Sequence, residues 1–157
     1  MDTGITLAGR VRLLALLAVL AVVGAAGCAA AKPTGGTVDV TLQEWAVVPA
    51  VASVAAGPVT FNVSNKGPDD PHEMVIVKTD LAPGQLPADE FGKVDEEGAG
   101  LEAIGEIEEF DPGKVETATF DLKAGSYVLI CNIVQDEPDG SKESHYRQGM
   151  YIAFTVK

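Results

Sequence analysis

The sequence predicts an all-β sandwich of about seven to eight short strands in residues 37–157. Apolar and polar residues alternate with a period of two along several short segments, as expected of strands with one buried face. Glycine, proline, asparagine and aspartate separate these segments, which is typical of turns between antiparallel strands. Many short strands punctuated in this way indicate two packed sheets.

Turn residues set most limits of the expected strands. In chain order the strands span residues 38–45, 59–63, 74–79, 106–110, 115–122, 127–133 and 150–156. The first alternates up to Trp45, which we interpret as a core residue, and the pattern is interrupted at Pro49. Gly57-Pro58 opens the second strand, and a turn at 111–114 joins the fourth to the fifth.

Two polar segments break the strand pattern. Residues 81–105 contain six carboxylates, five glycines and two prolines, which predicts an acidic loop with one helical turn around 101–104. Residues 136–144 form a polar excursion late in the chain. No internal repeat occurs, and the length fits one domain.

The N-terminal residues have the composition of an export signal. Arg10 and Arg12 precede the apolar stretch 13–23, and small residues follow up to Cys28. A basic start, a short apolar core and a small-residue site are typical of a secretory signal peptide. An uncleaved membrane anchor is the alternative if the small residues are counted as part of the apolar span.

Residues 25–28 resemble a bacterial lipobox, in which small residues precede a cysteine that receives lipid. The resemblance implies a signal peptide over 1–27, lipidation of Cys28, and a flexible tether over 28–36 that holds the domain 37–157 at a membrane face. Cleavage of an ordinary export signal near Ala31 is the competing interpretation.

The formal net charge of −12 bears on the partners. So acidic a chain repels a phosphate backbone, which excludes nucleic acid and favours a protein with a basic docking surface. Solubility alone would also explain the charge. The chain has two cysteines, and if Cys28 is used in processing, Cys131 has no disulfide partner. Metal ligation would protect such a thiol, and burial in the core is the alternative.

Four residues with soft or imidazole ligand atoms lie beside expected strands. His72 directly precedes strand 74–79, Cys131 lies in strand 127–133, and His145 and Met150 adjoin the last strand. Two imidazoles, one thiolate and a weak axial thioether form the ligand set of a blue-copper electron-transfer site. Each residue alone has an ordinary core or surface interpretation, but their joint order favours a metal site.

The domain resembles the cupredoxins, the plastocyanin and azurin type of blue-copper protein. Five segments carry the resemblance: residues 56–67, 71–72, 110–114, 124–131 and 145–150. It implies a Greek-key β-sandwich that binds one copper ion, as Cu(I) or Cu(II), through His72, Cys131, His145 and Met150. The resemblance further implies that His145 is the exposed edge through which electrons leave.

The chain departs from the family pattern in the ligand loop. Thirteen residues separate Cys131 from His145, whereas the family usually has only a few there. The longer loop costs more ordering entropy, and it brings Glu137 and Glu143 near the metal as alternatives to Met150.

A second departure lies beside the first histidine. The family commonly has Asn after this ligand, and this chain has Glu73. Because Asn132 follows Cys131, we expect Glu73 and Asn132 to brace the two ligand segments with their roles exchanged.

The expected function is single-electron transfer outside the cytoplasmic membrane, with a redox protein as partner. One alternative is a copper-binding module that delivers the ion to a copper-accepting protein, which the long loop favours. A metal-free, cupredoxin-like interaction domain is the other. An enzyme is not expected, because the sequence has no nucleophile–base pattern and no His-Glu-x-x-His zinc motif.

Overall fold

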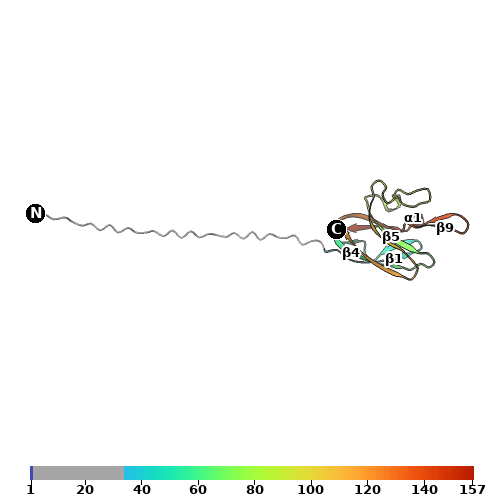
Figure 1. Ribbon diagram of the computed structural model, residues 1–157, viewed down its shortest axis with the longest axis horizontal. Helices are drawn as coiled ribbons and strands as arrows, with labels where there is room; N and C mark the ends of the chain where they lie inside the picture. The colour runs from blue at the N-terminus through green and yellow to red at the C-terminus, as the bar shows by residue number, and fades with distance from the viewer. Residues whose placement is uncertain (2–33) are drawn as a thin grey trace. The chain divides into compact units, whose positions relative to one another are not determined.

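The computed structural model describes Met1 and residues 34–157, and the latter fold into two packed sheets (Figure 1). The first sheet has the order β2 (Ala46–Pro49), β1 (Gly36–Gln43), β4 (Gly57–Asn65), β7 (Val115–Leu122). The second has the order β3 (Ser53–Val54), β11 (Tyr151–Val156), β8 (Gly125–Ile130), β5 (His72–Lys78), β6 (Glu102–Phe110). The chain crosses from one sheet to the other five times, at the β2–β3, β3–β4, β4–β5, β6–β7 and β7–β8 connections. This all-β, Greek-key sandwich confirms the predicted fold class.

Alternation along the strands accounts for the core between the sheets. Val38, Val40 and Leu42 of β1 are buried, while the residues between them are exposed or partly exposed. Phe61 of β4 lies at the centre of the core, with its ring centroid 5.9 Å from that of Phe154. The period-two pattern of the sequence thus becomes the inward-facing half of each strand.

Strand β5 is buried on both of its faces. The covering segment, which we define as residues 81–101, lies over the outer face of the second sheet, where Leu86 and Val94 pack against Val75 and Val77. This second apolar cluster explains why residues 74–77 form an unbroken apolar run, since a strand covered on both sides needs no polar face. The acidic segment is therefore a structural layer and not only a solvated loop.

The prediction of a helical turn around residues 101–104 is wrong. Strand β6 begins at Glu102, which pairs with Lys78 of β5, so ladder hydrogen bonding prevails over local composition there. Short helices instead occur at η1 (Pro83–Gln85) and α1 (His145–Gln148). The polar excursion 136–144 is largely a hairpin between β9 (Val134–Asp136) and β10 (Lys142–Ser144).

The expected signal peptide, the lipidation site at Cys28 and most of the tether lie outside the described residues. The described part of the chain contains no helix of the length and apolar character needed to cross a membrane. Strand β1 starts at Gly36, and the Gly35 N–H donates to the Ala56 carbonyl at 3.0 Å. The last two residues of the expected tether therefore pack as part of the sandwich.

Candidate metal centre

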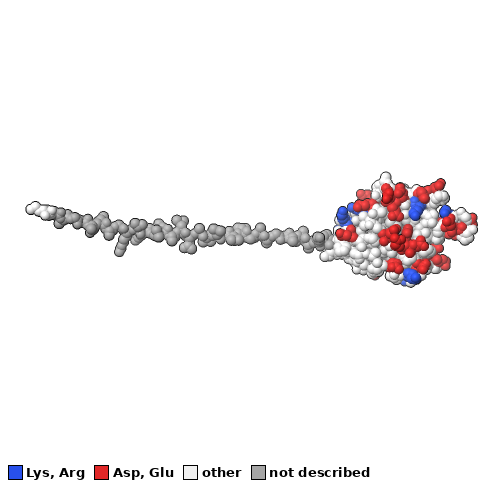
Figure 2. Space-filling view, in the orientation of Figure 1, with Lys and Arg blue, Asp and Glu red and all other residues white. Residues whose placement is uncertain are grey.

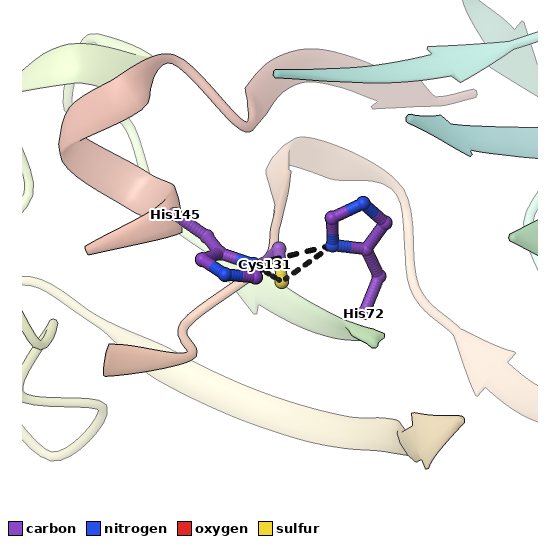
Figure 3. A group of neighbouring side chains, drawn as sticks. All are labelled: His72, Cys131 and His145. Atoms are coloured by element: carbon purple, nitrogen blue, oxygen red, sulfur yellow. Dashed lines mark hydrogen bonds between the residues drawn. The ribbon is translucent and has the colours of Figure 1, made fainter. Parts of the chain in front are cut away.

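Three of the four predicted ligands converge at one end of the sandwich (Figure 3). The Nδ1 atoms of His72 and His145 lie 3.2 Å apart. The Cys131 Sγ lies 3.3 Å from the His145 Nδ1 and 4.0 Å from the His72 Nδ1. All three side chains are fully buried, each with 0% exposure. Two imidazole nitrogens and one sulfur thus face a common point inside the protein.

The triangle of these three atoms has the size that one metal ion requires. A point equidistant from the three atoms lies about 2.1 Å from each, close to the bond lengths of about 2.0–2.3 Å that imidazole nitrogen and thiolate sulfur make with zinc-sized ions. A trigonal set of two histidines and one cysteine is the arrangement of blue-copper sites. The donor atoms present therefore fit a single copper ion without rearrangement.

A buried asparagine fixes the loop that leads into His72. The Asn65 Nδ2 donates to the carbonyls of Asp70 and Phe110 at 2.9 and 3.0 Å, and its Oδ1 accepts the Gly67 N–H at 2.8 Å. Asn65 has 0% exposure, so these bonds are shielded from water. One side chain thus ties the end of β4, the start of the His72 loop and the end of β6 together.

Glu73 and Asn132 connect the segments that carry His72 and Cys131. The Asn132 N–H donates to the Glu73 carboxylate at 3.0 Å, and the Glu73 N–H points at the Cys131 Sγ at 3.5 Å. The Asn132 side chain has a different partner: its amide exchanges two hydrogen bonds with the backbone of Val94, at 2.6 and 3.0 Å. The brace therefore uses the Glu73 carboxylate and the backbone of Asn132, while the Asn132 side chain holds the covering segment.

The short helix α1 places the last two predicted ligands. Ser144 caps it by accepting the Arg147 N–H at 3.1 Å, so the helix begins at His145. Gly149 ends it with a φ of 114°, in the left-handed region that glycine tolerates. Met150 is fully buried, and its carbonyl accepts the Cys131 N–H at 3.0 Å. The backbone of Met150, the fourth predicted ligand, therefore lies beside that of Cys131.

His145 is not an exposed edge, contrary to expectation. Its side chain has 0% exposure, and Trp45 lies against it with ring centroids 5.0 Å apart. Trp45 also meets His72 at 6.4 Å, in an edge-on arrangement. It is partly exposed, so it is both a cover over the two imidazoles and a residue at the surface.

Burial sets the protonation states of the three converging groups. It raises the pKa of the Cys131 thiol to about 12 and lowers the pKa values of both His72 and His145 below their usual value of 6.5. The metal-free protein at neutral pH therefore holds a neutral thiol between two neutral imidazoles. Because a copper ion binds the thiolate, metal uptake must release the Cys131 proton.

The two acidic residues considered as alternatives to Met150 lie in different places. Glu137 is at the turn of the β9–β10 hairpin, where its N–H donates to Ser141. Glu143 is closer: its carboxylate, that of Asp70 and a His145 nitrogen lie within 4.8 Å of one another. Each Glu143 oxygen also accepts from a glutamine amide, that of Gln135 or Gln148. Glu143 is therefore a neighbour of His145 outside the group formed with Cys131.

Sequence reasoning missed the residues that surround the ligands from the first sheet. The sequence predicts a core position for Trp45, which does pack against the core, but it does not indicate the contacts of Trp45 with the two imidazoles or the roles of Asn65 and Glu44. The Glu44 carboxylate lies 3.7 Å from the His72 Nε2 and accepts the N–H groups of Asp69 and Asp70. Nothing in the spacing of these residues indicates the site, because their proximity arises from pairing of β1 with β4.

Binding of Cu(II) should quench the fluorescence of Trp45, the only tryptophan in the chain. The indole lies 5.0 Å from the His145 ring, within contact range of a ligand to a redox-active ion. Zinc is the matched control, because it accepts the same ligands but has no redox chemistry. A titration that left the emission unchanged with Cu(II), or equally quenched with both ions, would contradict the placement of Trp45 beside the metal.

The fold is that of the cupredoxins, as solved structures show. Reduced auracyanin from the photosynthetic bacterium Roseiflexus castenholzii is 24% identical, with a TM-score of 0.50 over 79% of this chain and 98% of that chain. Auracyanin B is 23% identical, with a TM-score of 0.50 over 78% and 88%. Auracyanin A, described as a blue copper protein from Chloroflexus aurantiacus, is 21% identical, with a TM-score of 0.50 over 78% and 100%. The sequence matches no protein-family model and none of the curated proteins.

Proposed function

We propose that this protein belongs to the cupredoxin family and transfers single electrons through one type 1 copper ion. The observation that carries the proposal is the convergence of the His72 Nδ1, Cys131 Sγ and His145 Nδ1 atoms, at 3.2 to 4.0 Å from one another, inside a cupredoxin fold. Bound copper would supply a Cu(I)/Cu(II) couple. His72 and His145 would be the equatorial imidazole ligands, and Cys131 would supply the covalent copper–sulfur bond.

Met150 is the proposed axial ligand. It is fully buried, it follows α1 directly, and its backbone is hydrogen-bonded to that of Cys131. A thioether suits the weak axial position that tunes the potential of such sites. Glu143 is the hard-ligand alternative, and its two glutamine contacts argue against it, because ligation would have to compete with them.

The surroundings of the ligands support electron transfer more than catalysis or delivery. The Asn65 amide donates a hydrogen bond, and the Glu73 carboxylate and Ser144 hydroxyl accept one each. These bonds fix the three segments that carry ligands, which limits rearrangement between the two oxidation states. The buried group has no position open to a substrate, so we infer no enzymatic role. The ligand loop contains the paired strands β9 and β10, which lessens the support that its length lends to metal delivery.

The proposed setting is outside the cytoplasmic membrane. An export signal with lipid attached to Cys28 would hold the domain at a membrane face, where a redox protein would meet it. Cys131 is a free, buried cysteine. Such a thiol can persist in an oxidising compartment if burial and the proposed metal protect it.

The test is a titration of residues 32–157 with Cu(II), followed by visible and electron-paramagnetic resonance spectra, beside the variant Cys131→Ala. We expect an intense blue charge-transfer band with narrow copper hyperfine splitting, and we expect the variant to lose both. A red or pale product would indicate that Glu143 is the ligand in place of Met150, or would favour a copper-delivery function. If the protein takes up no copper, only the fold assignment stands, and a metal-free interaction domain becomes the favoured function.

A further inference from the structure

The proposed copper ligands are sealed from solvent. His72, Cys131, His145 and Met150 all have 0% exposure, so no edge of a ligand is available for direct contact with another protein. An electron that enters or leaves the site must therefore cross at least one further side chain. The position of that side chain determines where a redox partner can dock.

A side chain that passes an electron must contact the ligands and also reach the surface, and Trp45 does both. It contacts the two imidazoles, with ring centroids 5.0 Å from His145 and 6.4 Å from His72, and it is partly exposed. Its position follows from the sheet: it stands in the turn between β1 and β2, at the end of the first sheet where β1 pairs with Asn65. A large aromatic side chain in contact with both the site and the solvent is also a residue type that dominates protein interfaces.

Carboxylate residues lie on the segments that adjoin Trp45 and His145. We define the Trp45 rim as Glu44, Asp69, Asp70 and Glu143. Glu44 adjoins Trp45 and accepts the N–H groups of Asp69 and Asp70, at 3.1 and 2.8 Å. The carboxylates of Asp70 and Glu143 form one group with a nitrogen of His145, the imidazole that Trp45 covers.

Among residues 34–157, few cations offset the Trp45 rim. Lys66 lies near this end of the sheet, with its N–H donating to the Leu42 carbonyl. Arg147, the base on α1, is directed to the carbonyls of Asp89 and Glu90 in the covering segment. The domain as a whole is acidic, and carboxylates outnumber Lys and Arg over the face of it that Figure 2 shows. The surface at Trp45 therefore has a negative potential.

We propose that the redox partner docks over Trp45, that it presents basic side chains around its own redox centre, and that the electron crosses through the indole. The inference rests on the proposed function. One electron leaves the partner's redox centre and reduces Cu(II) to Cu(I), or returns in the opposite reaction, and no bond to the protein forms or breaks. The negative rim steers and orients the basic partner, which raises the rate of encounter.

The first test measures the charge preference of the copper-loaded protein in its reduced form. Tris(phenanthroline)cobalt(III), a cation, and hexacyanoferrate(III), an anion, are the oxidants, mixed by stopped flow. We compare Asp69→Lys with Asp121→Lys, which makes the same charge change at an exposed residue. Asp121 pairs with Pro58, at the opposite end of β4 from Ser64 and thus about 20 Å along the strand from the Trp45 end.

Asp69→Lys should lower the ratio of the cation's rate constant to the anion's by about tenfold at low salt, because the rim steers cations. Use of the ratio cancels any change in the potential of the copper. The effect should disappear at high salt, where the Debye length is about 3 Å. Asp121→Lys should leave the ratio nearly unchanged. Equal effects of the two substitutions would place docking elsewhere.

The second test concerns the indole. Trp45→Leu should react more slowly with both oxidants, because the substitution removes the aromatic ring that lies between the imidazoles and the surface, while Trp45→Phe should retain most of the rate. The blue band of each variant is checked first. If it is intact and Trp45→Leu reacts at the wild-type rate, the inference is overturned and the proposed function stands. If the wild-type protein forms no blue site, the proposed function itself fails.

Discussion

Replacing Asn65 by alanine should lower the free energy of unfolding by about 3 kcal/mol. The substitution leaves the carbonyls of Asp70 and Phe110 and the N–H of Gly67 without their side-chain partner in a fully buried place. Urea denaturation of the metal-free protein measures the loss. The copper-loaded variant should also have a perturbed blue band, because the loop before His72 loses its attachment to β6.

Asn62→Ala is the matched control for this experiment. Asn62 lies on the same strand, and its side chain bonds Asp39 and Thr117 in partly exposed positions. Water can replace these partners, so the expected loss is about 0.5 kcal/mol or less. Similar losses at the two positions would show that the buried network of Asn65 does not fix the loop.

Replacing Glu73 by glutamine should stabilise the metal-free protein by about 2 kcal/mol at pH 8 and have almost no effect near pH 4.5. Burial raises the pKa of Glu73 from 4.5 to about 7. The folded protein therefore retains a proton that the unfolded chain has lost, and the contribution of Glu73 to stability falls as the pH rises from about 4.5 to about 7. A pKa shift of this size corresponds to a stability change of about 3 kcal/mol. We expect a smaller effect, because the carboxylate keeps some contact with water.

The pH dependence of the difference between wild type and variant is the decisive measurement. Glutamine resembles the protonated acid and can still accept the Asn132 N–H, so the brace to the Cys131 segment is kept. Glu116→Gln, on an exposed part of β7, should show no such dependence. A difference that stayed constant between pH 4.5 and pH 8 would contradict a buried, ionisable Glu73.

The sequence was most informative where a local pattern has a direct structural meaning. Alternation predicted the inward-facing residues of β1 and β4, and the order of His72, Cys131 and His145 predicted which side chains to seek in one place. Strand pairing then brings His72 to within 4.0 Å of Cys131, although 58 residues separate them in the chain. A resemblance to a known family supplied this expectation, since the spacing alone is compatible with three unrelated residues.

What the sequence could not predict depends on contacts between distant segments. Trp45, which covers His145, lies in the turn between β1 and β2 and has no periodic relation to the ligand loop. Residues 81–101 look like a solvated acidic loop because their large apolar residues, among them Leu86 and Val94, are widely spaced and separated by charged residues and glycines. Only the tertiary structure shows that these two residues meet the outer face of β5.

The attachment of the covering segment to the ligand loop has a consequence for the kinetics of metal exchange. Side chains next to the ligands hold this segment: Asn132 holds Val94, Ser144 holds Gly92, and the Tyr146 hydroxyl bonds Pro83 and Leu86. The ligand loop therefore cannot swing open alone, and escape of an ion would require the joint detachment of about twenty further residues in one sub-global opening. If copper binds as proposed, this arrangement would slow the exchange of the ion.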